Sequence, residues 1–237
     1  GGYGIVLIEN SDVADAKMRI FNRDGSEGKM AGNAIRCVAK MVYDKDIVRK
    51  EEMTVETGAG IKNVKVYTSN GRVVSVEVDM GKPTFNPADL PCTLDEEKII
   101  DYPITIGRGC YNITCVGVGN PHCVVFLKDI DSLDLNEIGP YFEKADIFPE
   151  RINTEFVRIV NRHTIKMRAY ERGNKETFAC GTGAAAAVVA AVENGFCDKG
   201  EEITVKLKGG DLAVTYDDNG IFLTGNAVLV YEGEAEY

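Results

Sequence analysis

The sequence lacks a long hydrophobic run. Its longest apolar stretch, residues 184–192, has about half of the ~20 residues that a bilayer-spanning helix needs. The N-terminus also lacks the charged segment followed by an apolar segment that is typical of a secretory leader. These two features predict a protein that stays in the cytoplasm and does not contact a membrane.

Clusters of Lys and Arg are missing as well, and the net charge is -10. Because binding to nucleic-acid phosphates depends on clustered positive charge, the sequence argues against a nucleic-acid surface. A small anionic ligand would have to be held by local positive dipoles against an unfavourable overall field. Such dipoles occur at the starts of helices, where unpaired N–H groups present positive charge.

Metal-ligand spacings are absent from the seven cysteines, since no Cys-x-x-Cys pair or Cys/His pattern occurs. We expect no zinc site, no disulfide framework and no other metal or cofactor, and most of these thiols should be buried as small apolar side chains. With 237 residues and 44% hydrophobic content, the chain can form one large domain or two ordinary ones.

Strands dominate the periodicity, and two helices interrupt them. Apolar residues recur at helical spacing over residues 33–43, and residues 182–193 are apolar on nearly every face, which predicts a buried helix. The fold class is therefore α+β. The expected strands are 4–8, 17–21, 53–57, 64–67, 73–78, 112–118, 123–127, 156–160, 164–170, 203–207, 213–216, 221–224 and 227–231.

An internal repeat relates residues 27–34 to residues 176–183, at an offset of 149 positions. Each copy follows a strand and a charged turn, contains glycine, and leads into a helix. The repeat predicts two pseudo-symmetric domains with an active-site cleft between them. We expect an N-terminal domain of residues 1–80 plus 226–237 and a C-terminal domain of residues 81–225. Since Gly1 begins inside a turn, the first domain is expected to lack its initial segment.

Both helix starts have the residues of an anion-binding loop. The first turn of a helix presents unpaired N–H groups and a positive dipole end, and glycine lets a ligand approach them closely. Gly32 with Asn33, and Gly181 with Thr182, provide such loops. Ordinary helix capping is the alternative for either loop alone, but two matched loops favour a ligand.

Cys180 directly precedes the second of these helices. Helix N-terminal N–H groups stabilise a thiolate, so we expect its pKa to be lowered toward neutrality. A thiolate beside a carboxylate-binding loop suits removal and return of the α-proton of an amino acid. Racemisation needs a second acid/base group, yet the equivalent position in the repeat is Ala31, which cannot transfer a proton.

Four ordered segments of the sequence resemble the diaminopimelate epimerase family. Residues 19–27 are similar to its first signature, and Tyr170-Glu171-Arg172-Gly173 with residues 179–184 are similar to its second. Gly119-Asn120-Pro121-His122 and residues 152–156 match two further motifs in the same order. The resemblance extends from Gly4 to the end of the chain.

The resemblance implies an epimerase that interconverts LL- and meso-diaminopimelate without a metal or pyridoxal phosphate, for lysine and peptidoglycan synthesis. It also implies two domains that each wrap a curved mixed sheet around a central helix. The implied catalytic residues are Cys180, Glu171 and His122, with Ala31 at the position of the family's second catalytic cysteine. The implied substrate-binding residues are Asn22, Gly32, Asn33, Asn120, Asn153, Glu171, Arg172, Gly181 and Thr182.

Other interpretations stay open at this point. Asn22, Asn120 and Asn153 are also typical of turns, and His122 alone would be read as a structural histidine, as His163 is. Ala31 marks either an engineered chain or a divergent branch. The functional alternatives are a racemase or lyase for another amino acid, and a catalytically impaired amino-acid-binding protein. The expected partner is a small amino acid, and a homodimer is one option for the assembly.

Overall fold

The computed structural model describes residues 4–22, 24–29 and 31–234. Three features of the sequence lie outside the described residues: the expected turn at Gly1, Arg23 and Met30. The chain divides into two compact units, one made of Gly1–Val78 with Thr224–Tyr237 and the other of Asp79–Leu223. The expected boundaries lay two residues later, after 80 and after 225. Each unit is described by itself.

The first unit is a mixed sheet packed on one helix. Its strand order is β1-β2-β4-β5-β6, with the short β3 added to β2, and only the β2–β4 pair among these is parallel. Helix α1 (Gly32–Asp44) packs against β2, β4 and β5 through its apolar face. The strands are β1 (Gly4–Glu9), β2 (Ala16–Asn22), β3 (Glu27–Gly28), β4 (Glu52–Thr57), β5 (Gly60–Ser69) and β6 (Arg72–Gly81).

The second unit is a larger mixed sheet in the order β15-β14-β13-β11-β10-β9-β8-β7, with β12 added to β11. The β9–β10 and β11–β13 pairs are parallel. Its strands are β7 (Tyr102–Ile106), β8 (Gly109–Gly117), β9 (Pro121–Phe126), β10 (Asn153–Asn161), β11 (Thr164–Glu171), β12 (Lys175–Thr177), β13 (Glu202–Leu207), β14 (Gly210–Tyr216) and β15 (Ile221–Gly225).

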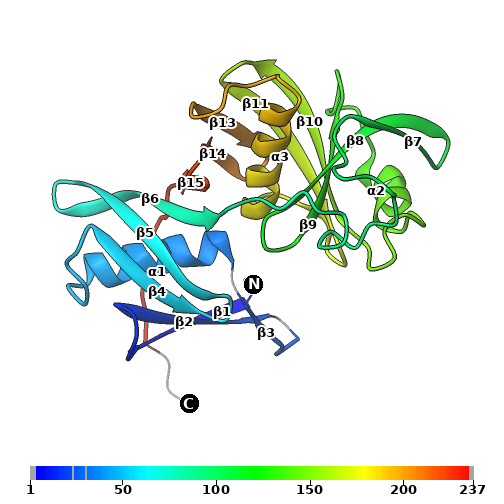
Figure 1. Cartoon of the computed structure of the whole chain (residues 1–237). Coiled ribbons are helices and arrows are strands. Elements are labelled where there is room, and N and C mark those ends of the chain that lie inside the picture. Colours follow the sequence, from blue (N-terminus) through cyan, green and yellow to red (C-terminus); the bar gives the residue numbers. More distant parts are fainter. Residues whose placement is uncertain (1–3, 23, 30, 235–237) are drawn as a thin grey trace. The chain divides into compact units, whose positions relative to one another are not determined.

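Helix α3 (Gly181–Glu193) is the centre of the second unit, with strands of the sheet curving around it (Figure 1). It contacts β8, β9, β10, β11, β13 and β14. Every side chain from Ala184 to Ala191 is fully buried. Alanine and valine serve here because small side chains let the surrounding strands approach the helix closely, while each still removes apolar surface from water.

Helix α2 (Leu135–Glu143) covers the opposite face of the same sheet. Phe142 of α2 meets Phe156 of β10 edge to face, with ring centroids 5.3 Å apart, and both are fully buried. Because side chains alternate along a strand, Phe156 faces α2 and the preceding Glu155 faces α3. This alternation brings a charged residue of β10 to the start of the central helix.

The expected α+β class is confirmed, and α1 and α3 begin and end within one residue of the expected helices. Helix α2 and the strands β3, β7 and β12 were not predicted. The strand expected at 227–231 is wrong: these residues form no strand, and Val228, Leu229 and Val230 are 71%, 65% and 85% exposed. Their β-branched pattern has no partner strand within the described residues. Over that same part of the chain, no helix is long and apolar enough to cross a membrane.

Candidate active site

Cys180 is the N-cap residue of α3. Its backbone is extended (φ -129°, ψ 109°), and its Sγ accepts a hydrogen bond from the Gly183 N–H at 3.3 Å. The Thr182 hydroxyl lies 3.6 Å from the same sulfur, and Cys180 is only 7% exposed. The thiol thus caps its own helix at the point where the backbone N–H groups of the first turn are unpaired.

The environment of Cys180 acts on its pKa in the direction opposite to our expectation. Burial raises the pKa of the thiol most, and the nearby carboxyl groups of Glu171 and Glu155 raise it further. The hydrogen bonds from Thr182 and Gly183 lower it, but they are weaker effects. Desolvation and two nearby carboxyl groups therefore outweigh the helix N-terminus, and the resting group is a thiol.

His122 and Glu155 form a buried pair below this helix start. Glu155 Oε1 lies 2.8 Å from His122 Nδ1, and both side chains are fully buried. The other ring nitrogen, Nε2, lies 2.9 Å from Asn120 Oδ1. The pair exists because β9 and β10 are parallel neighbours, with Asn153 opposite His122 and Glu155 opposite Val124 in the register.

Glu155 lies directly against the first turn of α3. A Cβ atom at Gly183 would be 2.6 Å from Glu155 Oε1 and 3.1 Å from Cys180 Sγ, so glycine is required there and both groups border the same point. The second carboxyl oxygen, Oε2, is buried and has no hydrogen-bond partner among the described residues. The carboxyl of Glu155 is therefore a close neighbour of the thiol.

A second group of polar residues gathers at the turn between β11 and β12. Glu171 ends β11, and the Thr177 hydroxyl donates to its Oε1. Asn153 fixes the turn, because its Oδ1 accepts from the Arg172 N–H at 2.9 Å while its Nδ2 donates to the Pro121 carbonyl at 3.1 Å. Asn153 itself is buried, whereas Arg172 is exposed.

Glu143, at the end of α2, supports the same turn from the other side. Its Oε1 accepts from the Gly173 N–H at 3.0 Å, and the residue is only 5% exposed. The Arg172 side chain donates to the Glu150 carbonyl at 3.1 Å. The turn that carries Glu171 and Arg172 is thus held by side chains from α2 and β10, which are remote in sequence.

In the first unit, Ala31 is the N-cap residue of α1 and, as alanine, makes no side-chain cap. Gly32 is buried and Asn33 is exposed. Arg36, one turn further along the helix, is 6% exposed and donates to Asn33 Oδ1 at 2.9 Å and to the Gly32 carbonyl at 3.2 Å. Its Nε donates to the Asn226 carbonyl at 3.4 Å.

Arg36 is a buried cation, and no carboxylate of the described residues forms an ion pair with it. Burial lowers the pKa of its guanidinium. Asn22, at the end of β2, uses its side chain in a local turn, where Nδ2 donates to Ser26 Oγ at 3.0 Å. The side chain of Asn22 therefore makes the turn contact that is typical of asparagine.

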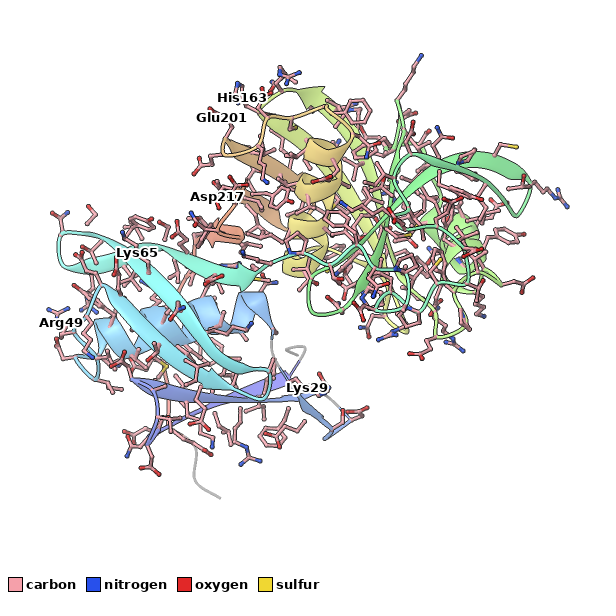
Figure 2. All side chains as sticks on the ribbon, viewed as in Figure 1. Lys29, Arg49, Lys65, His163, Glu201 and Asp217 are labelled. Atoms are coloured by element: carbon pink, nitrogen blue, oxygen red, sulfur yellow. The ribbon has the colours of Figure 1, made fainter. Side chains whose placement is uncertain are left out.

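The expected site residues fall into two groups, one in each unit. The second unit brings together Asn120, His122, Asn153, Glu171, Arg172, Cys180, Gly181 and Thr182, and the first unit holds Asn22, Ala31, Gly32 and Asn33. His163 is exposed in the turn between β10 and β11 (Figure 2). In the described part of the chain, no group of three or more His, Cys, Asp and Glu side chains has the arrangement of a metal site.

Two residues of the site were missed in the sequence. Glu155 gave a usable signal, since it directly precedes the apolar run Phe156-Val157 of an expected strand, and a carboxylate that is buried there needs a partner. Glu143 gave none, because an acidic residue near the end of a short helix is ordinarily solvated. Only the packing of α2 on the sheet reveals its contact with Gly173.

The fold defines the class of protein first. It is similar to a phenazine biosynthesis protein of the PhzF family from Bacillus anthracis, with a TM-score of 0.73 and 19% identity over 100% of this chain and 86% of that chain. It is also similar to a hydroxyproline epimerase from Agrobacterium vitis, with a TM-score of 0.67 and 16% identity over 94% of this chain and 72% of that chain. These likenesses establish a shared fold.

Sequence comparison then gives the family. The diaminopimelate epimerase family model matches residues 1–86 and 114–230. A diaminopimelate epimerase from Methanococcus maripaludis is 48% identical over 238 residues, covering 100% of this chain and 85% of the relative. One from Agathobacter rectalis is 46% identical over 245 residues, with the same coverage. The chain belongs to the diaminopimelate epimerase family, an isomerase family, and the expected membership is confirmed.

Proposed function

We propose that this chain is a cytoplasmic, cofactor-independent epimerase that interconverts LL- and meso-diaminopimelate, in the supply of lysine and peptidoglycan precursors. The observation that carries the proposal is Cys180, a buried thiol at the N-cap of α3 with two acidic side chains beside it, in a chain of this family. Its substrate is a small amino acid, whose carboxylate would be held by the local dipole of the helix start against a net charge of -10.

Cys180 is the group that moves the α-proton. Its raised pKa favours the protonated thiol at rest, which is the form that delivers a proton. To act as a base, the thiol must first give its proton to a neighbour, and Glu171 is the acidic group at the end of β11 available for this. Negative charge that develops on the substrate carboxylate is stabilised by the N–H groups of the first turn of α3, at Gly181 and Thr182.

The remaining residues bind the substrate. Asn33 and Asn120 present side-chain amides for the reacting end, and Asn22, Asn153, Glu171 and Arg172 serve the distal amino-acid end. In this assignment Asn153 acts partly through Arg172, because it fixes the backbone of the turn that carries this side chain. His122 assists proton transfer indirectly, through the position of Asn120, because its two ring nitrogens are already paired with Glu155 and Asn120.

Ala31 favours a second candidate function, in which the chain exchanges the α-proton of one isomer but does not complete the epimerisation. The alanine stands at the N-cap of α1, where the repeat predicts a partner for Cys180, and it has no proton to exchange. A chain with one competent thiol would exchange the α-proton of one isomer with solvent faster than it inverts the centre. A racemase or lyase for a smaller amino acid would use the same thiol without the residues of the distal end.

The test is deuterium incorporation at Cα of LL- and meso-diaminopimelate in heavy water, measured by proton NMR and mass spectrometry. We expect exchange with at least one isomer, and Cys180→Ala should reduce it by about 10²-fold or more. No exchange with either isomer would refute the proposal. Faster exchange with proline or another mono-amino acid would favour the alternative enzyme instead.

A further inference from the structure

A continuous line of hydrogen bonds leads from the interior of the second unit to Asn120. It begins at the carboxyl of Glu155, passes through both ring nitrogens of His122, and ends at Asn120 Oδ1, with distances of 2.8 and 2.9 Å. Glu155 and His122 are fully buried, whereas Asn120 is partly exposed. The line therefore connects a buried acid to an amide that a ligand can reach.

The donor and acceptor of each hydrogen bond in this line can be worked out from Asn120 Oδ1, which can only accept. Asn120 presents its carbonyl oxygen to Nε2, so Nε2 must carry the proton and donate it. A neutral imidazole then has an unprotonated Nδ1, which can only accept. The group facing Nδ1 at 2.8 Å is Glu155 Oε1, and it can donate only if Glu155 is a carboxylic acid.

The second oxygen of Glu155 supports the neutral acid. Oε2 is buried, and no group in the described part of the chain forms a hydrogen bond with it. A carboxylate oxygen with a formal charge would be costly there, whereas the carbonyl oxygen of a neutral acid carries much less charge. Burial, the largest effect, together with the charge of Glu171, raises the pKa of Glu155 against the opposing effect of His122.

We infer that Glu155 is a positioning residue: as the neutral acid it fixes His122 as the Nε2–H tautomer, which holds the Asn120 carbonyl inward and turns the Asn120 amino group toward the substrate. The inference rests on the proposed function, in which Asn120 binds the reacting end. It also removes the charge of Glu155 from beside Cys180, so that Glu171 is left as the neighbour proposed to receive the proton of the thiol.

The tautomer of His122 is directly observable. The chain has two histidines, so in a His163→Gln variant labelled with ¹⁵N-histidine all ring signals belong to His122. At neutral pH we expect a protonated, pyrrole-type Nε2 and an unprotonated, pyridine-type Nδ1. A protonated Nδ1, whether as the other tautomer or as an imidazolium, would overturn the inference. This measurement needs no turnover, so it stands apart from the failure of the proposed function.

Matched variants separate a donor from a charge at position 155. Glu155→Gln keeps a donor toward Nδ1, and we expect kcat/KM within about threefold of the original chain and the same His122 tautomer. Glu155→Met has similar length but no donor, so Asn120 should lose its fixed orientation. We expect KM for diaminopimelate to rise about tenfold or more, which is the scale of losing one hydrogen bond, here from Asn120 to the charged substrate. A Glu155→Gln variant that loses activity as Glu155→Met does would contradict the assignment.

The reactivity of Cys180 gives a third readout, independent of substrate. If Glu155 is already neutral, Glu155→Gln removes no charge, so the pH dependence of Cys180 alkylation by iodoacetamide should be unchanged. A shift of that profile to lower pH in Glu155→Gln would show that Glu155 is ionised and would overturn the inference. Should Glu155→Met fail to fold, the ring NMR and the Glu155→Gln variant still decide the question.

Discussion

Ala31 and Cys180 occupy the same structural position in the two units. Each is the N-cap of a helix of 13 residues, and their backbones are both extended, with φ -142° and ψ 124° at Ala31 and φ -129° and ψ 109° at Cys180. Cys180 caps its helix through Sγ, whereas Ala31 makes no side-chain cap. The two N-cap residues thus share a backbone conformation and differ in the sulfur atom that can exchange a proton.

Restoring a thiol at position 31 should therefore restore a second acid/base group. We expect Ala31→Cys to raise the rate of diaminopimelate epimerisation by about 10²-fold or more, because general acid–base groups typically contribute that much. The measurement is the rate of interconversion of the LL and meso isomers, followed by chiral chromatography. Unchanged turnover would mean that the second proton transfer does not depend on position 31.

The control for this variant is Ala31→Ser. A serine hydroxyl caps a helix well, so we expect the free energy of unfolding to rise by about 1 kcal/mol. Its pKa is far too high for proton exchange with an α-carbon, so epimerisation should stay at the level of the original chain. A gain in turnover with serine would assign the effect to helix capping.

Cys180 should react as a thiol with a raised pKa. Because its pKa lies above the ordinary value of 9.0, the thiolate fraction at neutral pH is small and grows only as the pH rises beyond that value. We expect alkylation of Cys180 to be slow at pH 7 and to increase with pH through the alkaline range. Mass spectrometry of peptides, in a Cys37→Ser/Cys110→Ser background that removes the exposed thiols, gives the rate. A plateau of the rate below pH 8 would show a lowered pKa.

Gly183 should not tolerate a side chain. A Cβ there would lie 2.6 Å from Glu155 Oε1 and 3.1 Å from Cys180 Sγ, so Gly183→Ala must displace buried groups. We expect a loss of about 1–3 kcal/mol in the free energy of unfolding, typical of overpacking, and a loss of proton exchange at the substrate. Denaturant unfolding and deuterium exchange measure the two effects.

Gly233→Ala provides a matched comparison, because a Cβ at Gly233 would meet no atom within 4 Å. That variant should unfold like the original chain. The interpretation of Gly183 fails if Gly183→Ala is as stable and active as Gly233→Ala.

Arg36 should strengthen substrate binding indirectly, although its guanidinium nitrogens donate to Gly32, Asn33 and Asn226 of the protein itself. It holds Asn33 Oδ1, which leaves the Asn33 amino group free to donate, and it places a buried positive charge one turn from the start of α1. We expect Arg36→Met to raise KM for diaminopimelate by about tenfold or more, with a smaller change in kcat. Arg36→Lys keeps the charge but loses the planar guanidinium, so its KM should lie between that of the original chain and that of Arg36→Met. A normal KM in Arg36→Met would contradict this role.

Several features of the fold were predictable because they are local. The helical periodicity of 33–43 and 182–193 located α1 and α3, and the uniform apolar character of the second predicted its burial on all sides. Gly181 and Cys180 marked a helix start by composition alone. The segment 227–231 shows the limit of this reasoning, since a β-branched pattern specifies a strand only where a partner strand is available to pair with it.

The sequence by itself determined the repeat, the two central helices and the identity of the thiol at a helix start, because these depend on residues close together in the chain. Tertiary structure alone decided the sign of the Cys180 pKa shift, since burial, the first cause, and the nearby carboxyl groups of Glu171 and Glu155 come from strands that converge on α3. It also decided the pairing of Glu155 with His122, which depends on the parallel register of β9 and β10. Electrostatic environments are set by distance in space, and only the folded sheet brings these groups within hydrogen-bonding reach.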